Sequence, residues 1–305
     1  MKKSKLILIE FFITLSSLVY IYTKTDLKNI EHYNLAFNLA NYIPALLLLF
    51  LSIFLITLRQ FHISSFLKIH LTKKSLFEIT ATSQLYGQIL PANVGSELYK
   101  LGKLSKYATK KDILLLIVID RFLGIFSLGV LYALFFPSGM ANLKDGLVLH
   151  VGFLLFCGLL FFLIMVVFIW LARTKISAIK TQVNKSGLVS VSNQKLINLV
   201  TLGAVNHFVV ILSTFFLAKS FGFDLSLSSL INSYTFATFA LVLPITIGGW
   251  GVREGIYSAV STAFGENALS AIIVSVSFGL SLILVGLLSY FVRVLCGAHN
   301  SKSGI

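Results

Sequence analysis

Residues 113–136 have the sequence ILLLIVIDRFLGIFSLGVLYALFF, which is apolar except for one Asp-Arg pair and isolated small residues. A transmembrane helix needs about 20 consecutive apolar residues, so this stretch is long enough to cross a bilayer. Comparable stretches occur on both sides of it. The sequence therefore predicts an all-α polytopic membrane protein with about six full transmembrane helices, at 6–22, 35–58, 113–136, 147–172, 197–220 and 268–294.

The composition of the whole chain agrees with this fold class. Of the 305 residues 57% are hydrophobic and only 12% are charged, and the mean hydropathy is +0.91. Soluble domains carry roughly 25% charged residues, so a water-soluble globular enzyme is excluded. We expect residues 1–305 to form a single integral membrane domain, without room for a separate soluble catalytic domain of about 100 residues.

The net charge of +14 has a topological interpretation. In a soluble protein it would suggest nucleic acid, but cytoplasmic loops of membrane proteins also collect Lys and Arg. Basic residues gather at 1–5, 59–74, 100–111 and 173–195, and a cytoplasmic N-terminus places all four segments, Arg59 included, on one face. We therefore expect an inner-membrane protein with both termini in the cytoplasm and no nucleic-acid partner.

Two segments within the first 80 residues need separate interpretation. The run at 6–22 contains Glu10 and no clear cleavage site follows it, which favours an uncleaved signal-anchor helix. The segment 60–79 is amphipathic and basic, and we expect it to lie on the membrane surface.

Two polar segments do not fit a simple transmembrane helix, and they resemble each other. Residues 90–97 are LPANVGSE and residues 243–250 are LPITIGGW. Pro91 and Pro244 should break the helices there, and broken backbone at membrane depth is tolerated only inside protein or against a water-filled cavity. We favour two re-entrant helical hairpins, at about 80–104 and 226–265, that enter from opposite faces as an inverted repeat. Two full helices kinked at proline are the alternative, but they would move the basic segments to the other face.

The first hairpin offers polar side chains for a lipid headgroup. Its candidates are Gln88, Asn93, Gly95, Glu97 and Lys100, of which the last two are neighbours one helical turn apart. The functional interpretation is a site that attracts anionic headgroups. The alternative is an ordinary interfacial helix whose lysines reach the aqueous surface.

Asp120 and Arg121 lie roughly 10 Å inside an apolar helix, given a rise of 1.5 Å per residue. Each charge at that depth costs roughly 2.5–3.5 kcal/mol on insertion scales, so it needs either a function or a partner. The two interpretations are a headgroup site and a structural ion pair to a hairpin, for example between Arg121 and Glu97 or Glu254.

The second hairpin contains GGWGVREG at 248–255. Backbone amides of a glycine-rich turn that opens a helix can bind phosphate, and the Arg253 guanidinium adds a bidentate donor. The candidates here are therefore Gly248, Gly249, Gly251, Arg253 and Glu254. The alternative is that these glycines serve tight packing. His207 lies in the middle of a predicted transmembrane helix and is expected to be a hydrogen-bonded packing residue. No His, Cys and carboxylate spacing suggests a metal, so we expect neither metal nor cofactor.

These positions resemble a known family. Gln88, Pro91, Gly95, Glu97 and Lys100, then Asp120-Arg121, then Pro244 and the GGxGVRE block at 248–254 are similar to the flippase-like membrane domain of lysylphosphatidylglycerol synthetases. The resemblance covers nearly the whole chain, although Lys100 stands where Arg would be expected.

The resemblance implies translocation of an anionic, aminoacylated or polyprenyl- or glycan-linked lipid between membrane leaflets. It implies membrane lipids as partners and no catalytic residue in this chain. A separate aminoacyl- or glycosyltransferase is a further candidate partner, since lysyl transfer by this chain alone is not implied. Two alternatives stay open: a membrane-embedded lipid-dependent transferase, and a non-catalytic scaffold for a partner transferase.

Overall fold

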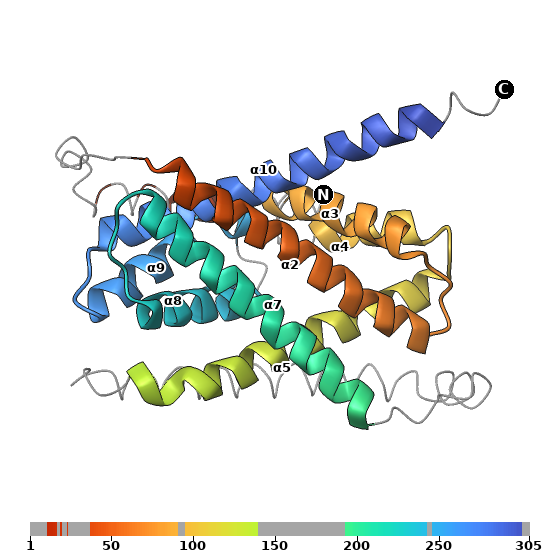
Figure 1. The fold of residues 1–305 in the computed structure, drawn as a ribbon, viewed down its shortest axis with the longest axis horizontal. Coiled ribbons are helices and arrows are strands. Elements are labelled where there is room, and N and C mark those ends of the chain that lie inside the picture. The colour runs from red at the N-terminus through yellow and green to blue at the C-terminus, as the bar shows by residue number, and fades with distance from the viewer. Residues whose placement is uncertain are drawn as a thin grey trace.

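The computed structural model describes residues 11–16, 19, 23, 37–90, 95–139, 193–242 and 246–300. All regular secondary structure in these ranges is helical, as the sequence predicts (Figure 1). The predicted helix at 147–172, most of that at 6–22, and Pro91, Asn93 and Pro244 lie outside the described residues. The elements are α2 (Leu39–Phe66), α3 (Lys73–Ile89), α4 (Gly95–Leu104), α5 (Lys110–Gly139), α7 (Asn193–Ser220), α8 (Leu227–Ala240), the 3₁₀ turn η4 (Ile247–Gly249), α9 (Val252–Ala263) and α10 (Ala268–Asn300).

Four of the described helices are long and apolar enough to cross a membrane. They comprise Leu39–Phe66, Lys110–Phe135, Asn193–Ser220 and Ala268–Phe291, and they coincide with four of the predicted transmembrane helices. Large apolar side chains on their outer faces are open to the surroundings, for example Leu47 at 65% and Leu134 at 71% exposure. Such exposure is the expected surface of a protein whose solvent is lipid.

The remaining helices form two pairs, each interrupted by a break. The first pair is α3 and α4, separated by residues 90–94, and the second is α8 and α9, separated by residues 241–251. At 1.5 Å per residue, α4, α8 and α9 are only about 15–21 Å long, less than the roughly 30 Å of a hydrocarbon core. In Figure 1 the α8–α9 pair and the α3–α4 pair lie toward opposite sides of the molecule.

The expected surface segment 60–79 is not a separate helix, because it is divided between α2 and α3. Helix α2 continues to Phe66, and Gln60 and Ile63 are 1% exposed. Helix α3 then begins at Lys73. Its N-cap residue is Thr72, whose hydroxyl accepts a hydrogen bond from the Ser75 amide at 3.2 Å. Gln60 and Ser64 are buried against neighbouring helices, whereas the basic residues Lys68, Lys73 and Lys74 remain exposed.

Helix α10 packs against both broken pairs, and two glycines seven residues apart allow close approach. A Cβ at Gly279 would overlap the side chains of Arg253 and Trp250 from the second pair. A Cβ at Gly286 would lie 3.1–3.3 Å from Cβ, N and Cα of Leu85 in the first pair. Helix α10 therefore holds both pairs through one face.

Candidate functional site

The two breaks meet at a partly buried contact. The indole Nε1 of Trp250 donates a hydrogen bond to the carbonyl oxygen of Gln88 at 3.2 Å. Gly248 has a φ of +58°, and a Cβ added there would overlap the same carbonyl. Segments about 160 residues apart are thus joined where their helices end. Glycine is required at position 248 by both the backbone conformation and the lack of space for a side chain.

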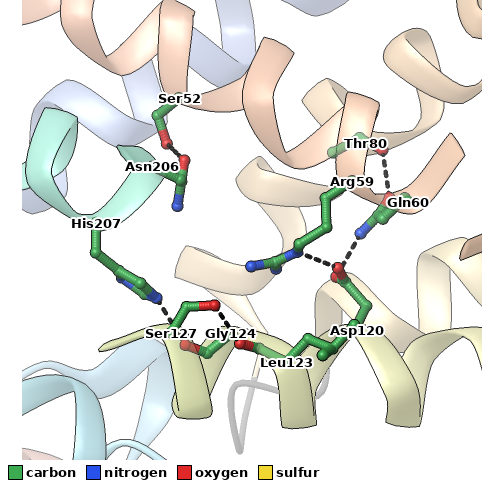
Figure 2. Close-up of polar contacts among 10 residues, drawn as sticks. All are labelled: Ser52, Arg59, Gln60, Thr80, Asp120, Leu123, Gly124, Ser127, Asn206 and His207. Carbon is green, nitrogen blue, oxygen red and sulfur yellow. Dashed lines mark hydrogen bonds and ion pairs between the residues drawn. The ribbon is translucent and has the colours of Figure 1, made fainter. Parts of the chain in front are cut away.

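A charged network connects three helices at the centre of the structure (Figure 2). The Asp120 carboxylate on α5 accepts from Arg59 Nε at 2.7 Å and from Gln60 Nε2 at 2.8 Å, both on α2. The Thr80 hydroxyl of α3 donates to Gln60 Oε1 at 2.9 Å. Both oxygens of a buried carboxylate are therefore paired, as the low dielectric of the surroundings requires.

Arg59 is the member of this network that the sequence interpretation did not place at membrane depth. It was expected at the cytoplasmic end of a transmembrane helix, but it is 6% exposed because α2 extends beyond it. Gly124 and Gly203 make space for its guanidinium: a Cβ at either would lie 3.1–3.4 Å from a terminal nitrogen. The signal that could have identified it is Asp120, a buried acid that needs a cation on a facing helix.

A second ion pair lies nearer the surface. Arg121 Nε donates to Glu97 Oε1 at 2.8 Å, so the ion pair between these residues, one of the alternatives considered from the sequence, is present and joins α5 to α4. The Arg121 side chain is 47% exposed and that of Glu97 18%. Lys100, one turn beyond Glu97, is only 7% exposed and interacts electrostatically with Asp120 and Glu97. The structure thus brings together four of the predicted site residues and adds Arg59.

The second broken pair, α8 and α9, carries a separate, fully enclosed cluster. Arg253 donates to Glu254 Oε1 at 3.0–3.2 Å and to the Ser275 hydroxyl at 3.1 Å, and that hydroxyl donates to Glu254 at 2.9 Å. Arg253 and Glu254 are 3% and 1% exposed. The guanidinium carbon also lies 4.9 Å from the ring centre of Trp250 and 5.5 Å from that of Phe278, a cation–π arrangement.

Two of the donors expected to bind phosphate, the Gly251 amide and the Arg253 guanidinium, are engaged within the protein. The Gly251 amide donates to Glu254 Oε2 at 2.6 Å, so this carboxylate caps α9 from its third position. Gly249 has a φ of +80° and packs against Leu241, where a Cβ would not fit. In this conformation the GGxGVRE block therefore closes the second break and locks α9 to α10.

Ser275 offers a test of this lock. We expect Ser275→Ala to lower the free energy of unfolding by about 1–3 kcal/mol, because both charged partners lose a hydrogen bond in a buried site. Unfolding in mixed detergent micelles measures the change. Thr262→Ala is the matched control, since the Thr262 hydroxyl is exposed and bonds only to the carbonyl of Ser258 in its own helix. Equal effects of the two substitutions would contradict the interpretation.

His207 is a packing residue, as predicted. Its Nε2 donates to the Gly124 carbonyl at 3.0 Å, which leaves Nδ1 to accept from the Tyr234 hydroxyl at 2.8 Å (Figure 2 shows the Gly124 contact). A neutral imidazole satisfies both bonds. Nearby, Ser52 on α2 donates to Asn206 Oδ1 at 2.7 Å and joins α2 to α7.

Comparison with known proteins now decides the family. Residues 7–289 match the family described as "Lysylphosphatidylglycerol synthase TM region". The chain belongs to this family. No curated protein and no solved structure matches it significantly. Membership of the lysylphosphatidylglycerol synthase TM-region family, together with four membrane-crossing helices, shows a multi-pass membrane protein and suggests a link to lipid metabolism.

Proposed function

We propose that this member of the lysylphosphatidylglycerol synthase TM-region family translocates a lipid with a phosphate-containing headgroup between membrane leaflets. The observation that carries the proposal is the contact between the two broken helix pairs beside buried charges. Charged side chains and interrupted helices are costly in a bilayer and mark substrate sites in many transporters.

The two broken pairs would be re-entrant hairpins. Helices α4, α8 and α9 are too short to cross the membrane. The Gln88–Trp250 hydrogen bond joins the two breaks, each of which lies between the helices of its pair, away from the residue where the pair begins. With the N-terminus in the cytoplasm of an inner-membrane protein, the first hairpin enters from the cytoplasmic side and the second from outside. The C-terminus is then also cytoplasmic.

The headgroup would pass the Glu97–Arg121 pair. This pair is partly exposed, whereas Arg253 and Glu254 are enclosed, so it is the one that a headgroup can reach without unfolding a helix. Arg121 can attract a phosphate and Glu97 an amine, which suits anionic, aminoacylated and polyprenyl- or glycan-linked lipids alike. The acyl chains would remain in the bilayer beside the exposed apolar faces.

Leaflet exchange of a fluorescent phosphatidylglycerol in reconstituted vesicles tests the proposal. We expect Arg121→Gln to slow leaflet exchange about tenfold, equivalent to about 1.4 kcal/mol. The apparent melting temperature should change by only about one or two degrees, because a partly exposed ion pair stabilises the fold little. The matched control is Lys106→Gln, an exposed lysine just beyond α4 that should leave the rate unchanged.

The same vesicles separate the other functions. Relocation of the labelled lipid without new covalent products supports translocation. New lipid products made by the protein alone would establish a transferase and overturn the proposal. Exchange that is no faster than in protein-free vesicles, and that appears only with a partner transferase, would indicate a scaffold and overturn it as well.

A further inference from the structure

Two buried cations in the central network have donor capacity that the protein leaves unused. Arg59 is 6% exposed, and its Nη1 has no hydrogen-bond partner. Lys100 is 7% exposed, and its ammonium makes no hydrogen bond within the described part of the chain. A buried donor without an acceptor costs free energy comparable to a lost hydrogen bond, and more when it is charged.

The charges around these donors do not cancel. Among the described residues the network contains three cations, Arg59, Lys100 and Arg121, and two carboxylates, Asp120 and Glu97. Each carboxylate is paired with one arginine, so Lys100 has no carboxylate of its own. One positive charge therefore remains uncompensated in a low-dielectric region, and a bound anion of charge about −1 would offset it.

The network is reachable from the surface. Arg121 is 47% exposed and is the chain neighbour of Asp120, which is buried. An anion that displaces or passes the Arg121–Glu97 pair would come close to Lys100, which interacts electrostatically with Glu97, Arg121 and Arg59. When no ligand is bound, the second carboxylate oxygen of Glu97 is a candidate hydrogen-bond acceptor for the Lys100 ammonium. This oxygen, Oε2, is also buried without a hydrogen-bond partner.

Lys100 differs from its neighbours in that it can lose its charge. The two guanidinium groups stay protonated at all relevant pH values, whereas a buried lysine releases its proton readily. The charged groups that face it are Arg59 from α2, Glu97 from its own helix, and Asp120 and Arg121 from α5. Helix α3 contacts α4 through Tyr86, which stacks on Tyr99 with ring centres 4.5 Å apart, and no charged group of α3 interacts detectably with Lys100.

We propose that Lys100 and Arg59 form a proton-linked anion site, in which a phosphate-type monoanion binds only while Lys100 is protonated. Anion and proton then bind together and leave together, because each raises the affinity for the other by the same factor. The identification of the anion as a lipid phosphate rests on the proposed function, but the site and its proton linkage do not. Neither Arg59 nor a linked proton follows from the sequence.

Binding of glycerophosphoglycerol to the purified full chain in detergent, measured by calorimetry, tests the site. This phosphodiester keeps one negative charge throughout the measurement. We expect its affinity to fall at least about tenfold between about pH 7 and about pH 10, as lysine loses its proton. Lys100→Arg should bind with an affinity that changes less than about twofold over the same range, because arginine stays charged.

Two further variants define the site. Lys100→Gln should weaken binding about tenfold at about pH 7, as expected for loss of one charge-assisted hydrogen bond. Lys103→Gln, an exposed lysine on the same helix, is the matched control and should bind as the native protein does. Native affinity in Lys100→Gln, or an undiminished pH dependence in Lys100→Arg, would overturn the proposal.

Parallel titrations with short-chain phosphatidylglycerol and with inorganic phosphate identify the source of the anion. Binding of either diester supports a lipid headgroup, whereas binding of inorganic phosphate alone would overturn that assignment. Lost anion binding with normal leaflet exchange would refute this site and leave the proposed function standing. Normal, pH-linked binding without leaflet exchange would refute the proposed function alone.

Discussion

Asp120→Asn is expected to destabilise the protein by about 3–5 kcal/mol, the cost of leaving a buried charge without its partner. The substitution removes the counter-charge of Arg59 and weakens the Gln60 bond, so α2, α3 and α5 lose their shared connection. Unfolding in mixed micelles and the yield of monodisperse protein both report the effect. Asp112→Asn is the control, because Asp112 lies on the same helix but is bonded only to the exposed Thr109 side chain.

A double variant distinguishes structural from functional roles of the same pair. Replacing both partners, Arg59→Met with Asp120→Leu, removes the Arg59 charge that Asp120→Asn leaves without a partner. In other buried pairs such a double replacement often restores or exceeds native stability. We expect it to recover most of the stability that Asp120→Asn loses while anion binding stays absent. Full recovery of both stability and binding would show that the network is only structural.

Gly248→Ala is the second large expected effect. Alanine at a φ of +58° costs about 1–2 kcal/mol, and its Cβ would also overlap the Gln88 carbonyl, so we expect a total loss of at least about 2 kcal/mol. The breaks would have to separate, which should also slow leaflet exchange. Both unfolding and exchange therefore need to be measured on this variant.

Gly255→Ala provides the matched control. Gly255 lies in α9, a few residues away, and a Cβ there meets no atom within 4 Å. Alanine is the better helix former, so this variant should gain up to about 1 kcal/mol. If Gly248→Ala were as well tolerated as Gly255→Ala, the contact between the breaks would not be a structural requirement.

The sequence predicted those features that depend on local pattern. The length of the apolar stretches predicted the limits of four helices to within four residues, apart from the C-terminal ends of α2 and α10. Proline and glycine located both breaks. The Glu97–Arg121 pair was among the expected partners because both residues are charges that an apolar setting cannot leave alone.

The remaining features depend on how the helices pack. An arginine at the end of an apolar run has the pattern of an interfacial residue, and only the continuation of α2 to Phe66 and the glycines of α5 and α7 bury Arg59. Likewise, nothing local shows that Ser275, 22 residues away, completes the enclosure of Arg253. The sequence pattern of the GGxGVRE block therefore did not show that Arg253 and the Gly251 amide are bonded within the protein.

The two glycines of α10 have a mechanical consequence. Gly279 receives Arg253 and Trp250 of one broken pair, and Gly286 receives Leu85 of the other, on the same face two turns apart. A rotation or shift of helix α10 would therefore disturb the contacts at both glycines at once. The two broken pairs are thus coupled mechanically through α10, in addition to their direct contact at Gln88 and Trp250.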